Sequence, residues 1–126
     1  MAFGTLKADT LTHSTAGSLA TNFVVDGTPK YWIQYNGNTN AISGSLNSSS
    51  VTDNGTGDYS FIFSNAFSST GYSCTGAHRS PGATAGTGAN FDQAAGNTRY
   101  YTFQEEASAA NFNATQISVT ISGDLA

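Results

Sequence analysis

The stretch SVTDNGTGDYSFIF (residues 50–63) decides the fold class. Its second half places an aromatic side chain at every other position, Tyr59, Phe61 and Phe63, which is the period of two of a β-strand with one buried face. Between its halves lies Asn54-Gly55, a step that takes positive φ cheaply, as hairpin turns require. We therefore expect a β-hairpin whose aromatic face points into a core.

Working outward from this hairpin, further strand patterns follow at short intervals, separated by turn residues. Tyr31, Ile33 and Tyr35 share one strand face, and the same alternation recurs in residues 116–121 near the end of the chain. The expected strands outside the hairpin cover residues 22–25, 30–35, 41–46, 71–75, 98–104 and 116–121. Residues 107–110 suit one helical turn at most. Seven or eight short strands joined by turns predict an all-β fold, an antiparallel β-sandwich.

Composition excludes several functional classes. Charged residues make up 10% of the 126 positions, the net charge is -4, and nearly half of the residues are Gly, Ser, Thr or Asn. Four basic side chains cannot neutralise a run of phosphates, so nucleic acid is not an expected partner. Apolar runs are far shorter than the roughly 20 residues that cross a bilayer, so we expect no membrane partner. The single cysteine, Cys74, excludes an internal disulfide and is expected to be a buried, inert thiol.

Catalytic and metal-binding patterns are weak. The stretch GYSCT (residues 71–75) resembles a nucleophile elbow around Ser73 but has threonine in place of its second glycine. His78 and Asp92 have no diagnostic spacing for a catalytic triad, and we expect His78 to be an exposed loop residue. Two distant histidines and one cysteine do not make a zinc site. We therefore expect no enzyme activity, no metal and no cofactor.

The N-terminal segment differs from the rest of the chain. Residues 1–20 contain few apolar side chains and cannot bury enough surface to fold alone. We expect an extended attachment arm over residues 1–20, with Phe3, Leu6, Lys7 and Leu11 as its contacts, followed by an outer domain over residues 21–126. Such an arm becomes ordered when it binds another subunit or a larger particle.

The outer domain offers a second set of candidate contacts. A long loop of small residues occupies positions 80–89 and is expected to be mobile. If the domain recognises a surface glycan, the contacts are expected from this loop and from exposed side chains beside it. The candidates are Trp32, His78, Arg79 and Phe91. The alternative, that the aromatic residues belong to the core and to subunit contacts, is favoured.

Three stretches together resemble the tailed-phage virion surface proteins, a family of capsid decoration and short tail-fibre-like proteins of aquatic phages. They are GTLKADTL (residues 4–11), KYWIQYNG (residues 30–37) and VTDNGTGDYSF (residues 51–61). The first is similar to the opening segment of these proteins, the second to the strand that follows, and the third to their characteristic hairpin. Their order and spacing carry the resemblance, which covers most of the chain.

The resemblance implies a non-enzymatic homotrimer on the exterior of the virion, made in the host cytoplasm. The chain lacks the long shaft or adaptor of a full tail fibre, so we expect a capsid decoration, or cement, protein that binds the major capsid protein. The alternative is the receptor-binding tip of a short tail fibre, attached to a tail-fibre or baseplate protein and recognising a host surface glycan. The resemblance brings no catalytic residues with it.

Overall fold

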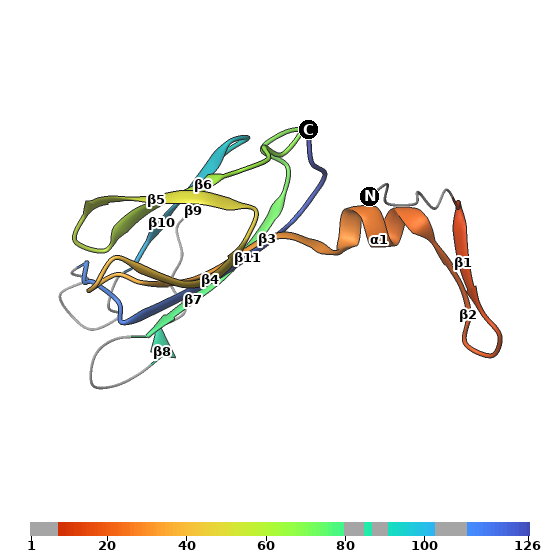
Figure 1. The fold of residues 1–126 in the computed structure, drawn as a ribbon, viewed down its shortest axis with the longest axis horizontal. Coiled ribbons are helices and arrows are strands. Elements are labelled where there is room, and N and C mark those ends of the chain that lie inside the picture. The colour runs from red at the N-terminus through yellow and green to blue at the C-terminus, as the bar shows by residue number, and fades with distance from the viewer. Residues whose placement is uncertain (1–7, 80–84, 87–90, 103–110) are drawn as a thin grey trace, which may run out of the picture.

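The computed structural model describes residues 8–79, 85–86, 91–102 and 111–126. Figure 1 shows a β-sandwich from which an N-terminal hairpin and a short helix project. The elements in chain order are β1 (Thr10–His13), β2 (Gly17–Ala20), α1 (Thr21–Gly27), β3 (Pro29–Asn36), β4 (Ala41–Leu46), β5 (Ser48–Gly55), β6 (Asp58–Phe63), β7 (Ser73–Arg79), β8 (Ala85–Gly86), β9 (Phe91–Ala94), β10 (Asn97–Tyr101) and β11 (Gln116–Ser122).

Two antiparallel sheets form the sandwich, which confirms the predicted fold class. One sheet has four strands in the order β5-β6-β10-β9, and the other has five in the order β4-β3-β11-β7-β8. Aromatic rings from β3 and β6 interlock between the sheets, with ring centroids 4.9 Å apart for Tyr31 and Phe63 and 5.2 Å apart for Tyr35 and Tyr59. Both pairs meet edge to face, the geometry that aromatic pairs prefer.

The core follows from the alternation in the sequence. Every second side chain of β3, β6 and β11 is buried, as the period of two predicts. The buried apolar residues of these three strands are Tyr31, Ile33, Tyr35, Tyr59, Phe61, Phe63, Ile117, Val119 and Ile121. Each strand therefore gives one face to the core, and the opposite face of the five-stranded sheet is left outside.

The hairpin over residues 50–63 is present as predicted, formed by β5 and β6. The positive φ values lie at Gly55 (137°) and Gly57 (70°), where glycine avoids the steric cost of a Cβ. Gly57 is also a packing position, because a Cβ there would lie 2.7 Å from the carbonyl oxygen of Thr102. The turn thus places its second glycine against the segment that follows β10.

One local prediction differs from the structure. Residues 22–25 were expected to form a strand, but they lie inside α1, where no sheet edge runs alongside to pair with them. Consequently the sandwich begins at Pro29, and the projecting segment includes α1 as well as the hairpin. The expected helical turn at 107–110 lies outside the described residues, as does most of the loop at 80–89, apart from β8.

Candidate functional site

The β1–β2 hairpin presents two leucines beside each other. Leu11 and Leu19 are directly opposed in the antiparallel register, so their side chains leave the same face of the ribbon. They are 42% and 45% exposed. The neighbouring pair, Thr12 and Ser18, joins hydroxyls at 3.0 Å. A two-stranded ribbon of this kind is marginally stable alone, so its apolar face is suited to contact with another surface.

Helix α1 continues the projecting segment and lacks the capping and burial that usually stabilise a short helix. It has seven residues, no side-chain cap at its N-terminus and no buried residue, whereas isolated helices shorter than roughly 12–15 residues are marginal in water. Phe23 is 65% exposed and Val25 53% exposed. Thr21 fixes the helix to the hairpin by donating its backbone N–H to Asp9 O (2.9 Å) and its hydroxyl to Ala8 O (2.7 Å).

The junction between α1 and the sandwich is short and hydrogen-bonded. Thr28, the one residue between α1 and β3, has extended backbone angles and donates its hydroxyl to Val24 O at 2.6 Å. The Lys30 ammonium turns back and donates to Thr28 O (3.1 Å) and Oγ1 (2.7 Å), which brings a positive charge to the helix C-terminus, where it is favourable. The helix therefore leaves β3 in a defined direction, away from the sandwich (Figure 1).

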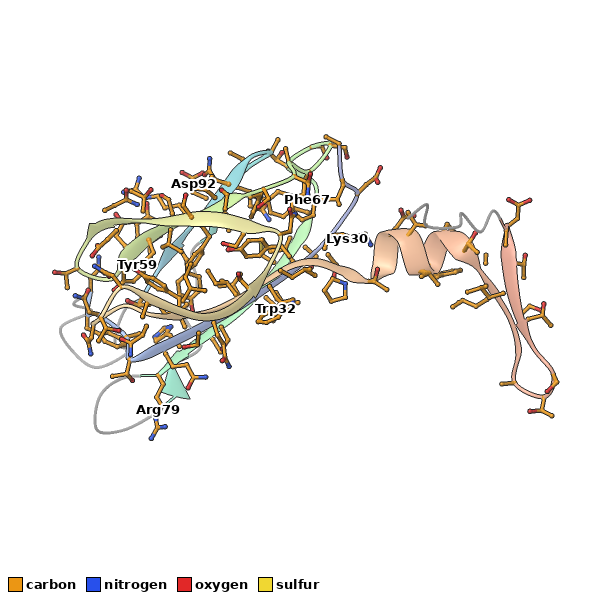
Figure 2. All side chains as sticks on the ribbon, in the orientation of Figure 1. Lys30, Trp32, Tyr59, Phe67, Arg79 and Asp92 are labelled. Atoms are coloured by element: carbon orange, nitrogen blue, oxygen red, sulfur yellow. The ribbon has the colours of Figure 1, made fainter. Side chains whose placement is uncertain are left out.

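A second group of exposed apolar side chains lies on the outer face of the five-stranded sheet. Trp32 of β3 and Leu46 of β4 are directly paired in the register and are 40% and 48% exposed. The Trp32 indole extends over Gly44 of β4, where an added Cβ would lie 3.1 Å from the ring. We call Trp32, Gly44 and Leu46 the outer-face patch. Figure 2 shows Trp32 pointing away from the space between the sheets.

The candidate glycan contacts are not gathered by the structure. The prediction that His78 is exposed is wrong, because its side chain is 3% exposed and lies on the inward face of β7, opposite Ile117 of β11. Arg79, the next residue, is exposed. Trp32 is on β3, separated from β7 by β11. Phe91 begins β9 of the other sheet, and its side chain lies outside the described part of the structure.

His78 instead belongs to an aromatic group in the core. Its Nδ1 lies 3.0 Å from the Tyr100 hydroxyl, and its ring contacts Phe112 edge to face at 5.4 Å between centroids. Burial raises the pKa of Tyr100 far above its usual range, so the phenol stays neutral. This arrangement satisfies a polar group within the sandwich, and it accounts for His78 without any catalytic role.

Cys74 is half-buried on the inward face of β7. Burial raises the pKa of its thiol, and Gln93 Nε2 donates to its Sγ at 3.5 Å. The protonated thiol is a weak nucleophile, so the position suits packing more than chemistry. Among the described residues, no three His, Cys, Asp or Glu side chains gather in a way that would hold a metal ion.

Of the four predicted arm contacts, Leu11 is exposed on β1, whereas Phe3, Leu6 and Lys7 lie outside the described residues. Sequence reasoning missed Leu19, Phe23, Val25 and Leu46 as exposed apolar positions. The apolar run that contains Phe23 and Val25 was expected to form a strand, so their exposure on a helix was not predicted. In the described part of the chain, no helix is long and apolar enough to cross a bilayer.

No protein-family model, curated protein or solved structure matches this chain.

Proposed function

We propose that the protein is a non-enzymatic structural component of a phage virion, a capsid decoration protein. In this proposal it binds the outer surface of the head as a homotrimer. The N-terminal arm contacts the major capsid protein, and the β-sandwich forms the exterior domain. The resemblance of residues 4–11, 30–37 and 51–61 to virion surface proteins supports the role.

The single observation that carries the proposal is the projecting hairpin with its paired leucines. Leu11 and Leu19 lie on one face of a ribbon that Figure 1 shows well away from the sandwich. Among the side chains that the structure describes, none from the hairpin or from α1 belongs to the buried core. A segment that adds nothing to its own core and exposes apolar side chains is suited to order and bury them against a larger surface.

The lack of charge in the hairpin and in the first part of α1 supports the same role. Residues 10–25 contain no Asp, Glu, Lys or Arg, so docking this segment would not remove an ion from water without a partner. Binding would be driven mainly by burial of the leucine pair. Among the described strands, β1 and β2 pair only with each other, so the backbone groups along their outer edges are available to pair with a strand of the capsid protein.

Imaging of virions at modest resolution tests the location directly. Density for the sandwich at three-fold positions of the head is expected, and density at the tail tip or baseplate would favour a receptor-binding tail protein. Deleting residues 2–15 should leave the sandwich folded but prevent its incorporation into particles. Normal incorporation of this truncated protein would contradict the proposal.

The receptor-binding alternative has weaker support from the geometry, because His78 is buried and Trp32 and Arg79 lie on separate strands. It still makes a distinct prediction, which is that the isolated sandwich is retained on an array of host glycans. Trp32→Ala should abolish that retention if the exposed indole stacks on a sugar.

A further inference from the structure

Two exposed apolar surfaces occur on the same chain, and within one copy neither surface covers the other. One is α1, with Phe23 65% exposed and Val25 53% exposed. The other is the outer-face patch, in which Trp32 and Leu46 are 40% and 48% exposed. We infer that α1 of one copy packs across the outer-face patch of a second copy, with Phe23 against Trp32 and Leu46.

The apolar residues of both surfaces lie in stretches of sequence without charged side chains, and Asp26 is the one charged residue of α1. Residues 10–25 and residues 31–52 contain no Asp, Glu, Lys or Arg. In a chain with twelve charged side chains, these two stretches can meet without stripping water from an unpaired ion. Phe23, Val24 and Val25 of α1, a helix whose one charged residue is Asp26, therefore meet an indole and a leucine that lie within the uncharged stretch of residues 31–52.

The two surfaces also match in size and type of element. A seven-residue helix is about 10 Å long, which is the width of two neighbouring strands and their side chains at a strand spacing of about 4.8 Å. The patch spans two such strands, β3 and β4. A helix covering one face of a sheet is the common way for both elements to bury their apolar sides.

The contact must form between copies, because the junction holds α1 away from its own sheet. Only Thr28 separates the helix from β3, and its hydroxyl and backbone N–H both donate to Val24 O. Lys30 clamps the same residue through two further bonds. Figure 1 shows α1 directed outward from the start of β3 and away from the sandwich, which leaves the helix open to the patch of a neighbouring molecule.

A helix on one surface and a sheet face on another make a head-to-tail contact. Such contacts close into a ring when the rotation between copies permits, and three copies give the trimer of the proposed function. Only this number of copies rests on the proposed function. The contact itself leaves the leucine pair of the hairpin free to bind the major capsid protein.

Size-exclusion chromatography with light scattering, over a range of protein concentrations, tests the contact with the full chain. Wild-type protein is expected to form a closed oligomer. Phe23→Asp damages the helix surface and Leu46→Asp damages the patch, and each should weaken self-association by about 100-fold and give monomers. Thr56→Asp adds the same charge at the exposed β5–β6 turn, and this control should leave the oligomer unchanged.

Mixing the two damaged variants gives a sharper test. The intact helix of the Leu46→Asp copy can dock on the intact patch of the Phe23→Asp copy, and the complex cannot grow further. An equimolar mixture is therefore expected to form dimers of one copy each, although each variant alone is monomeric. A near-ultraviolet circular dichroism signal from the tyrosine-rich core checks that both variants are folded.

Three results would overturn the inference: a monomeric wild type at the highest concentration, variants that keep the oligomer, or a mixture that stays monomeric. If the wild type is monomeric and both variants lose particle binding, the capsid protein covers these surfaces, and the proposed function stands without the self-contact. If the oligomer behaves as expected but never joins particles, the self-contact stands and the proposed function fails.

Discussion

Among the glycines that the structure describes, Gly37 is the one where packing leaves the least space for an added Cβ. It is buried just after β3, donates its N–H to Ala114 O at 2.9 Å, and lies against the Tyr59 ring. A Cβ at this position would overlap the Tyr59 hydroxyl and lie 2.7 Å from Cζ of the same ring. Gly37→Ala is therefore expected to lower the free energy of unfolding by about 1–3 kcal/mol, the usual cost of overpacking. Urea denaturation measures the change.

Gly96 provides the matched control for this substitution. An added Cβ there meets no atom within 4 Å, and no positive φ requires glycine. Gly96→Ala is expected to change the free energy of unfolding by less than about 0.5 kcal/mol. Equal effects of the two substitutions would contradict the packing argument for Gly37.

The ion pair between Asp58 and Arg99 gives stability a pH dependence at the residue scale. Arg99 donates to both carboxylate oxygens of Asp58, at 2.8 Å from Nε and 2.5 Å from Nη2. This hydrogen bonding, chiefly, lowers the pKa of the Asp58 carboxyl below its usual range. A lowered folded-state pKa stabilises the protein above the unfolded pKa, and the contribution is lost as pH falls through the folded value.

Asp58→Asn is therefore expected to be less stable than the wild type at pH 7, with the difference shrinking as pH falls below about 4. Thermal melts at a series of pH values measure this difference. Asp26→Asn, on the exposed surface of α1, removes one negative charge away from this ion pair and controls for the change in net charge. A difference that stays constant down to pH 2 would show that the Asp58 carboxylate does not carry the effect.

At the scale of the element, strands with a strict alternation of apolar and polar residues were predictable. Successive side chains of a strand point to opposite faces, so the period of the sequence is also the period of burial. Residues 58–63 and 116–121 place apolar side chains at every second position, and the structure buries those side chains. The segment Asn22-Phe23-Val24-Val25 lacks that alternation and was expected to be a strand because of its β-branched residues. Without a sheet edge beside it, the backbone satisfies its hydrogen bonds within a helix instead.

The candidate site was less predictable than the fold. His78 is preceded on the inward face of β7 by Gly76 and Cys74, which give no apolar alternation from which burial can be inferred. Its burial comes from the register with β11, which places it opposite Ile117. Similarly, the exposure of Trp32 and Leu46 depends on which face of the sheet lacks a covering layer. Such long-range pairings are not local properties of the sequence.

The projecting elements are expected to contribute almost nothing to the stability of the sandwich. The buried core begins at Tyr31, and no residue of α1 is buried. Deleting residues 2–28 should therefore leave the free energy of unfolding within about 0.5 kcal/mol of that of the full-length Phe23→Asp variant, which serves as a monomeric reference. A loss of several kcal/mol would show that the arm folds back onto the sandwich in solution.

At the scale of the whole molecule, the last strand of the chain occupies the centre of a sheet. β11 lies between β3 and β7 and buries Ile117, Val119 and Ile121. Removing residues 114–126 leaves β3 and β7 without their shared partner. It also leaves the backbone N–H and C=O groups unpaired along one edge of each of these two strands. This truncated chain is expected not to fold, in contrast to the chain that lacks residues 2–28.

The two truncations form a matched pair that shows which end of the chain the folded sandwich requires. The C-terminal deletion is the shorter of the two, yet it should abolish near-ultraviolet circular dichroism and the dispersion of the NMR spectrum, whereas the N-terminal deletion preserves both. The reason is topological. Pairing of β3 with β11 joins residues that are distant in the sequence, and the five-stranded sheet cannot form until both strands are present. A folded chain ending at residue 113 would contradict this dependence on the final strand.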